Sequence, residues 1–540
     1  MNKLSIKNKL TKVLENSLEE LNIKFNPDIE IIIKRSSSEQ NGDYFTDIAL
    51  FLSEKMKLPC IVIANKIAEK VKNTNFIDKI TVSSQGFINF YLKKEFILSY
   101  INKIINEKGN YGKNNNGKGK KINIQFLSAN PFEILNIHHG MELTYGDNLA
   151  RILIFNGFDV TKEYYINDVG DQIKKLGISI KEKYKEICNI NYCTPEDSYF
   201  GKEIIKIANE IYTEYGDNKI GNETYFFQEK GIDIFLKNLK KELDYYRVNF
   251  NTFTSEKSLY DQCLVEDIIN KLRESGNCYI KDDALWLKTT DPSDRQDSIL
   301  IKSDGDYTYL ISNIAYHINK INRGYNKIVD VLVANHDENI NQLKSALTIL
   351  DQDEDILDIK ILPILTLKTS KTNEEIITLR DLVKEIGVNE MRYFFSLHPL
   401  DNKIDFNIDQ ALKKSNENPI YYIEKINAKI SAILRNYRKM PILQEKYLDL
   451  TLNNDNAYII LKKLMDFEDI VIDAAKKEAP NLIAKYVYEL VDLFHSFYLN
   501  EKFITDSEEK IDEKINLLIA IQIVIENSLD LLEIIPREEL

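Results

Sequence analysis

The chain has 540 residues, and its 71 Lys and Arg against 84 Asp and Glu give a formal net charge of −13. A content of 44% hydrophobic and 29% charged residues is ordinary for a folded protein of about three to five domains and excludes global disorder. The acidic balance argues against a protein that coats nucleic acid indiscriminately, although it leaves room for a local basic face.

Targeting and redox signals are weak in this sequence. Met1–Leu10 carries scattered lysines without a long apolar stretch, and no uncharged apolar run reaches the ~18 residues of a membrane span. The five cysteines (Cys60, Cys188, Cys193, Cys263 and Cys278) include no Cys-x-x-Cys pair, which argues against a disulfide scaffold and a zinc knuckle. We therefore expect a cytoplasmic protein with reduced thiols, no membrane contact and no bound metal of its own.

Residues 1–107 are predicted to form a small α+β domain. Helical periodicity runs from about Lys3 to Leu21, and the alternating stretches Ile29–Lys34 and Ile80–Ser84 indicate strands. A strand-like run over Gly86–Tyr91 and a helix to about Ile105 close the domain.

Residues 108–121 are predicted to be a flexible basic linker, because they contain four Gly and four Asn and no apolar residue except Tyr111. A hinge without a function of its own is the simpler interpretation. Contact with a polyanion is the alternative.

Residues 122–400 are predicted to form an α/β domain. The strand Ile122–Leu127 leads into Ser128–Pro131, a helix runs from about His139 to Asn156, and a second strand covers Asp159–Ile166. Strand, polar loop, helix and strand in this order open a nucleotide-binding α/β domain. Further strands are expected at Ala284–Lys288, Ser298–Lys302, Thr308–Ile311 and Ile328–Ala334.

Residues 410–540 are predicted to form an all-α domain, since nearly the whole segment has amphipathic helical periodicity. Pro419, Pro441 and Pro480 mark helix starts or connections.

This order of domains, together with seven colinear motifs, resembles the arginyl-tRNA synthetases, a family of class I aminoacyl-tRNA ligases. The motifs are Ser128–Pro131, Glu163–Asp168, Ala284–Thr290, Ile314–His317, Thr378–Leu382, Ser415–Pro419 and Phe494–Tyr498. The resemblance covers nearly the whole chain. It implies a Rossmann-like catalytic core between an N-terminal α+β domain that contacts tRNA and an all-α anticodon-binding domain.

The first class I signature, normally His-x-Gly-His, aligns with Asn136, Ile137, His138 and His139. In the family the imidazoles donate to the ATP phosphates, and the glycine lets adenine lie against bare backbone. The resemblance therefore implies that Asn136, His138 and His139 bind ATP, with His139 catalytic. Asn136 keeps a donor without a charge, whereas His138 puts a ring where adenine stacks, so we expect weak ATP binding.

The second signature, normally Lys-Met-Ser-Lys-Ser, aligns with Lys368–Thr372. The resemblance implies that Lys371 stabilises the pyrophosphate in the transition state, with Lys368 as a second catalytic residue and Ser370 at the ATP. Taken alone, Lys-x-Ser-Lys is more often a solvated surface loop. Its place just before Thr378–Arg380 favours the site.

The implied amino-acid pocket departs from the family. Arginine recognition there uses a glutamate five residues before the Asn of Ser-x-Asn, then a tyrosine and an aspartate four residues later, because carboxylates suit a guanidinium. Here these positions are Gln125, Tyr309 and Asn313, so both acids are amides. Drift in an inactive site and a pocket remade for a neutral side chain both remain open.

The other implied amino-acid contacts are Ser128, Asn130 and His336. His336 is equally well explained as a structural residue, because its family segment Gly-Ala-Asp-His-His-Gly has become Val333–Glu338. The implied tRNA-binding residues are Asn418, Tyr421, Tyr422, Lys425 and Lys429, within a locally basic stretch for which a solvated helix face is the alternative explanation.

The function implied by the resemblance is ATP-dependent attachment of arginine to tRNA through an aminoacyl adenylate, with Mg²⁺ as cofactor. The expected partners are tRNA, ATP and arginine or a neutral analogue, and we expect a monomer. Two alternatives stay open: a catalytically impaired paralogue that binds tRNA or regulates, and a ligase for a different, neutral amino acid.

Overall fold

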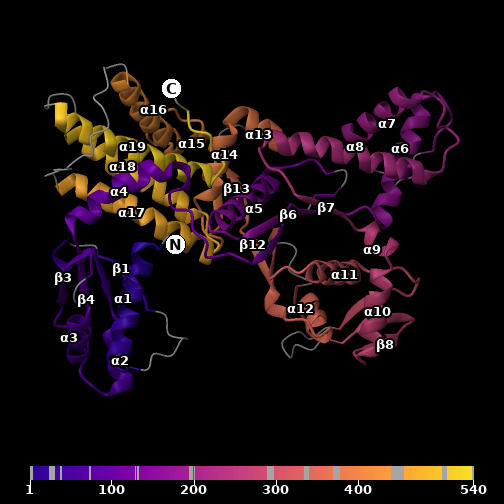
Figure 1. Ribbon diagram of the computed structural model, residues 1–540. Coiled ribbons are helices and arrows are strands. Elements are labelled where there is room, and N and C mark those ends of the chain that lie inside the picture. The colour runs from indigo at the N-terminus through magenta and orange to yellow at the C-terminus, as the bar shows by residue number, and fades with distance from the viewer. Residues whose placement is uncertain are drawn as a thin grey trace.

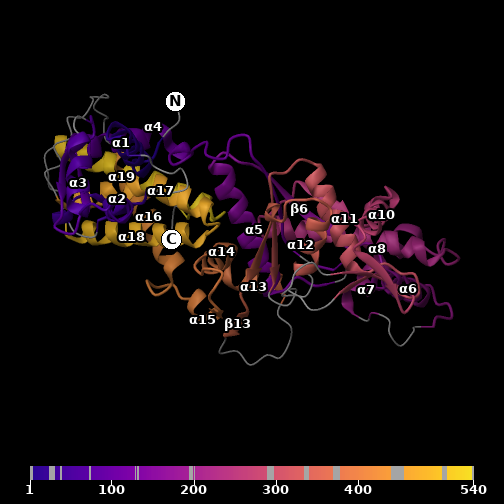
Figure 2. The same cartoon turned by 90° about the horizontal axis from the view of Figure 1, so that it is seen from below.

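In the computed structural model the α/β core lies between a helical bundle with the N-terminal domain on one side and two smaller substructures on the other (Figures 1 and 2). The structure describes residues 4–23, 31–36, 39–71, 74–127, 129–130, 133–193, 199, 201–288, 297–333, 340–368, 378–438, 455–500 and 508–537. No helix among these residues is long and apolar enough to cross a membrane.

The N-terminal domain combines helices and strands, as predicted, and its sheet is antiparallel. Helix α1 (Ile6–Glu20) begins at Ser5, whose side chain accepts a hydrogen bond from the Asn8 amide, and buries Leu10, Leu14 and Leu18 along one face. The sheet has the order β1 (Ile33–Arg35), β2 (Tyr44–Thr46), β4 (Ile88–Leu92), β3 (Ile77–Val82), and the remaining helices are α2 (Ile48–Met56), α3 (Cys60–Lys70) and α4 (Lys94–Glu107).

This domain docks on α17 (Asp455–Lys476) through ion pairs. Arg35 pairs with Asp466 at 3.0 Å, and Lys7 pairs with Asp473 at 3.2 Å. Between them Asp469 is buried, and its Oδ2 has no hydrogen-bond partner among the described residues. Burial raises the pKa of Asp469 to about 7, so the neutral acid is the form that this interface favours.

The prediction of a flexible linker at 108–121 is wrong. Tyr111 is fully buried, and its hydroxyl donates to the backbone oxygen of Leu464 at 2.9 Å. Gly117 lies against the ring of Phe158, where a Cβ would come within 2.2 Å. Asn114 donates to Asn156 at 2.7 Å. The glycines and asparagines therefore allow close packing and turns, which composition cannot distinguish from flexibility.

The core sheet is parallel and has the strand order β12-β11-β5-β6-β7. Its strands are β5 (Lys121–Gln125), β6 (Asp159–Ile166), β7 (Thr252–Ser255), β11 (Lys327–Val333) and β12 (Leu357–Leu362). Helix α5 (Ile137–Phe155) connects β5 to β6, and β11 lies on the other side of β5. The strand order thus reverses next to β5, which is the position where α/β sheets bind ligands at the carboxyl ends of their strands.

One predicted strand is wrong. Thr308–Ile311 forms the start of helix α11 (Tyr309–Asn322), whose apolar residues Leu310, Ile311, Ile314 and Ile318 follow a helical spacing. Thr308 still bonds to the end of β10 (Ser298–Ile301), which explains the strand-like pattern just before the helix. As a result, Tyr309 and Asn313 lie one helical turn apart.

Two substructures extend the core. The helices α6 (Asp171–Ile187), α7 (Lys202–Tyr215) and α8 (Thr224–Tyr245) form one of them, seen at the upper right of Figure 1. The second contains the predicted strands β9 (Ala284–Leu287) and β10, with β8 (Cys278–Lys281), α9 (Lys257–Asp261), α10 (Leu264–Glu274), α11 and α12 (Ile340–Ile349).

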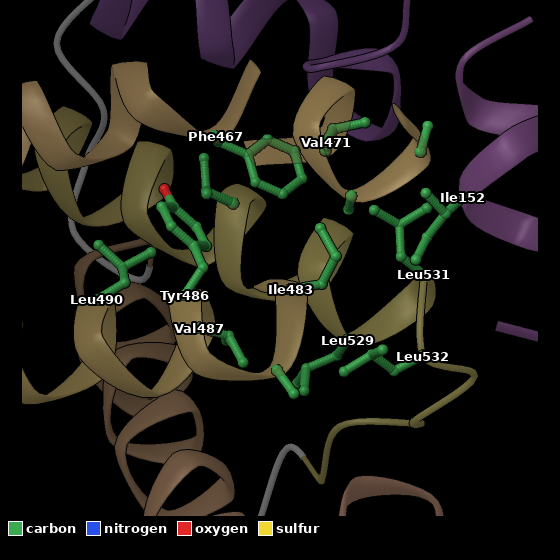
Figure 3. Packing of buried hydrophobic residues seen from close by; sticks show 14 of the residues in the cluster. Ile152, Phe467, Val471, Ile483, Tyr486, Val487, Leu490, Leu529, Leu531 and Leu532 are labelled. Carbon is green, nitrogen blue, oxygen red and sulfur yellow. The ribbon is translucent and has the colours of Figure 1, made fainter. Parts of the chain in front are cut away.

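The C-terminal region is all-α, as predicted. After β13 (Leu365–Lys368), α13 (Leu379–Ile386), α14 (Val388–Ser396), β14 (Ile404–Asn407) and α15 (Ile408–Ala411), the bundle contains α16 (Pro419–Arg438), α17, α18 (Asn481–Asn500) and α19 (Glu508–Asp530). Figure 3 shows Phe467, Ile483 and Leu532 of this region packed together, with Ile152 of α5 at the edge of the same cluster.

A buried polar network joins the bundle to α5. Arg392 of α14 is fully buried and donates to Asp147 Oδ2 at 2.7 Å, to Asn148 Oδ1 at 2.8 Å and to the backbone oxygen of Leu532 at 2.9 Å. Asp147 also accepts from Lys162 at 2.7 Å. Burial alone would raise the pKa of Asp147, but Arg392 and Lys162 hold it below its ordinary value.

Candidate active site

Three polar residues form a row across the central strands, at the last residue of β5 and at inner positions of β6 and β11. The register pairs Gln125 of β5 with Glu163 of β6 on one side and with Asp330 of β11 on the other. Glu163 is buried and accepts two hydrogen bonds from Arg323, at 2.8 and 2.9 Å. The row lies beside the reversal of strand order, and Gln125, at the carboxyl end of β5, is its member nearest to the expected ligand position.

Lys320 of α11 connects two members of this row. Its ammonium group is fully buried and donates to Gln125 Oε1 at 2.5 Å and to Asp330 Oδ1 at 3.0 Å. Burial lowers the pKa of Lys320, although the neighbouring carboxylates of Asp330 and Glu163 act to raise it. Burial alone would raise the pKa of Asp330, but Lys320 and His317 hold it well below its ordinary value. Each carboxylate of the row is therefore ionised and already paired with a cation.

The contact with Lys320 fixes the orientation of Gln125. An ammonium group can only donate, so it must face the amide oxygen, and the Gln125 Nε2 group turns away from it. Tyr309 begins α11 with 53% of its surface exposed, and Asn313 is half-buried one turn later. The Asn313 backbone oxygen contacts His317 Nδ1 at 2.8 Å, and His317 Nε2 lies 2.7 Å from Asp330.

The start of α5 carries the first predicted signature. Asn136 caps the helix through Oδ1, which accepts from the amides of His138 at 2.9 Å and His139 at 3.3 Å. His139 Nδ1 accepts from the Asn136 amide at 3.0 Å, which completes a capping box. Burial lowers the pKa of both histidines, and His138 Nδ1 is buried without a hydrogen-bond partner among the described residues.

Two further contacts complete this end of the helix. Glu133 Oε1 lies 3.7 Å from His139 Nε2. The Leu379 amide, at the start of α13, donates to the Leu135 backbone oxygen at 2.7 Å. Since Leu379 directly follows the segment that contains the second signature, this bond ties the end of that segment to the start of α5.

Several predicted site residues lie outside the described residues: Ser128, His336, Ser370 and Lys371. Lys368, the last residue of β13, is exposed and donates to Asp405 at 2.6 Å. Asn130 is half-buried, and its backbone amide donates to Glu133 Oε2 at 3.4 Å. The roles of these residues stay predictions.

Two of the predicted tRNA contacts do not fit the structure. Asn418 is 2% exposed and donates to the backbone oxygens of Ala411 and Lys413, and Tyr422 is 5% exposed with its hydroxyl 2.8 Å from His495 Nδ1. Both side chains are used inside the domain, because Asn418 holds the start of α16 and Tyr422 joins α16 to α18. Tyr421, Lys425 and Lys429, spaced four residues apart, remain as the predicted tRNA-facing stripe.

Sequence reasoning missed Lys320, Asp330 and Glu133. A signal existed for Asp330, which is a charge in the middle of the apolar strand Lys327–Val333, and for Lys320, which lies on the apolar face of α11. Among the described residues there is no cluster of three or more His, Cys, Asp or Glu that could hold a metal ion.

Comparison with known proteins identifies the family. Three domain families match: Arginyl tRNA synthetase N terminal domain at residues 6–92, tRNA synthetases class I (R), catalytic domain at 100–360, and DALR anticodon binding domain at 424–540. An arginine–tRNA ligase of Halalkalibacterium halodurans is 34% identical over 95% of this chain and 94% of its own length. That of Geobacillus thermodenitrificans is 36% identical with the same coverage.

Solved structures agree with this assignment. The chain is similar to a putative arginyl-tRNA synthetase from Campylobacter jejuni, with a TM-score of 0.76 and 27% identity over 83% of this chain and all of the other. The arginyl-tRNA synthetase from Thermus thermophilus has the same fold, with a TM-score of 0.80 over 99% of this chain and all of the other, at 16% identity. This chain belongs to the arginyl-tRNA synthetase family.

Proposed function

We propose that this chain joins arginine to tRNA in two ATP-dependent steps. In the first step a carboxylate oxygen of arginine attacks the α-phosphorus of ATP and pyrophosphate leaves. In the second step a hydroxyl of the tRNA 3′ end attacks the adenylate carbonyl and AMP leaves. Family membership over 95% of the chain carries this proposal, supported by a parallel sheet with its polar row at the reversal of strand order.

The chain's own residues contribute position and charge. His139 donates from Nε2 to a phosphate oxygen, and Lys371 neutralises the charge that builds on the pyrophosphate. Asn130, Tyr309 and Asn313 hold the amino acid. Mg²⁺ enters with the ATP phosphates, since such ions are usually bound by substrate phosphates and one or two carboxylates rather than by a protein cage. The protein acts as a monomer in the cytoplasm.

The test is arginine-dependent exchange of pyrophosphate into ATP, followed by charging of tRNA. We expect both activities in the wild type and a loss of at least ~100-fold in Lys371→Ala, as for other groups that stabilise a transition-state charge. Lys403→Ala serves as the matched control, because Lys403 is an exposed lysine outside both signatures. Equal loss in both variants, or exchange without arginine, would contradict the proposal.

A second candidate function has its own support. His138 stands where the family has glycine, which favours a paralogue that binds tRNA without activating an amino acid. Filter binding tests the tRNA surface in either case. Replacing Lys425 and Lys429 by alanine should lower the salt slope of binding by about 1.5, whereas the exposed pair Lys271 and Lys281 should leave it unchanged.

A further inference from the structure

Glu133 lies over the start of α5, beside the residues that are proposed to hold the ATP phosphates. Its carboxylate reaches His139 Nε2 with Oε1 at 3.7 Å and accepts from the Asn130 amide with Oε2 at 3.4 Å. Its own amide donates to the Asn130 backbone oxygen at 2.9 Å. These contacts hold an anion at a helix N-terminus, where the helix dipole favours negative charge.

His139 has one ring proton to offer at this point. Its Nδ1 accepts from the Asn136 amide, so the neutral ring carries the proton on Nε2. Burial lowers the pKa of His139, against the opposite effect of Glu133, and this supports the neutral ring. A phosphate that accepts from Nε2 would therefore lie next to Glu133 Oε1, which is 3.7 Å from the same nitrogen.

We propose that Glu133 acts as an internal anion in the phosphate position, so that ATP binds only when the carboxylate turns away from His139. This inference rests on the nucleotide site proposed above. Two anions at one donor repel each other, and the repulsion is strong at a partly buried position. The Glu133 side chain is 38% exposed, so it can turn into solvent without leaving a buried charge.

The experiment compares binding of ATP and of adenosine by calorimetry in Glu133→Gln. The amide keeps the shape and one acceptor but removes the charge, so ATP should bind roughly 5- to 30-fold tighter. Adenosine carries no phosphate and should bind as before. Glu54→Gln, an exposed position in α2, makes the same change in net charge and should alter neither affinity. All variants are also measured in a His138→Gly background, where the adenine position is open.

Unchanged ATP affinity in Glu133→Gln would overturn the proposal. An equal gain for ATP and adenosine would also overturn it, because the effect would then come from packing rather than charge. If no variant binds ATP in either background, the nucleotide site itself is absent and the proposal fails with it. A selective gain for ATP without arginine-dependent exchange would support the role of Glu133 while contradicting the proposed ligase activity, so the two failures can be distinguished.

Discussion

Restoring the two lost carboxylates should have unequal effects on arginine binding, and Lys320 is the reason. A hydrogen bond to a charged group contributes about 1.5–3 kcal/mol, against about 0.5–1.5 kcal/mol for a neutral pair. Replacing both acids by Gln125 and Asn313 should thus weaken arginine binding by on the order of 2–4 kcal/mol, or roughly 30- to 1,000-fold. Sequence alone divides this loss evenly between the two positions.

The structure predicts that the loss of arginine affinity is divided unequally between Gln125 and Asn313. A glutamate at position 125 would lie within hydrogen-bond reach of Lys320, which now donates to Gln125 Oε1 at 2.5 Å. Part of its charge would therefore be neutralised inside the protein. We expect Gln125→Glu to recover about 1 kcal/mol or less, and Asn313→Asp about 2 kcal/mol. In affinity these gains are roughly 5-fold and 30-fold.

Calorimetry with arginine and citrulline checks this reasoning. Citrulline has a neutral ureido group of similar shape, so its affinity reports packing without charge. Each variant should bind arginine more tightly than the wild type does, with citrulline affinity unchanged, and the increase should be larger for Asn313→Asp than for Gln125→Glu. A larger gain in Gln125→Glu would refute the role of Lys320. Micromolar arginine binding by the wild type, with a clear preference over citrulline, would refute the charge argument as a whole.

Four other substitutions test separate parts of the structure. His138→Gly should tighten ATP binding, measured by calorimetry, because it relieves overlap with adenine. Asn136→His should leave ATP affinity unchanged. The same change should lower the stability by about 1 kcal/mol in thermal unfolding, because the helix cap is lost. Arg392→Met should destabilise the fold by about 3 kcal/mol in urea unfolding, because Asp147 stays buried with fewer partners; a loss below ~1 kcal/mol would contradict this. The pKa of Asp469 is about 7 in the folded state, above its value in the unfolded chain. The contribution of Asp469 to the free energy of unfolding is therefore fully present below about pH 4 and is lost as the pH rises to 7. Asp469→Asn should therefore stabilise the protein at pH 8, on the order of 2–4 kcal/mol, but not at pH 4, and equal effects at both pH values would contradict the assignment.

The sequence predicted those parts of the fold whose information is local. The strand Asp159–Ile166 and the helix predicted before it, from about His139 to Asn156, are both present in the structure as β6 and α5. The errors arose where the same amino-acid composition is compatible with two different local structures. Glycine and asparagine around Tyr111 indicate either flexibility or tight packing, and only the neighbouring residues decide between them.

The part of the site that is formed by residues close together in the sequence was predictable. Asn136 and His139 were recognised as the head of a helix, and they form its cap. The contact of Lys320 with Gln125 was not predictable, because it depends on strand register and on a residue 195 positions away. Registers between distant strands leave no periodic trace in a single sequence.

The register also changes what the substitution at Gln125 means. With a glutamate there, Lys320 would lie between two carboxylates, and one negative charge would remain for a substrate cation. With Gln125, Lys320 and Asp330 neutralise each other, and Arg323 does the same for Glu163. An amide has the shape of the acid, so the change removes a charge from the site while leaving its geometry intact. On the nucleotide side Glu133 places an anion next to His139. Binding of charged and neutral analogues, measured separately for each substrate, therefore reports the charge at the two substrate positions more directly than turnover does.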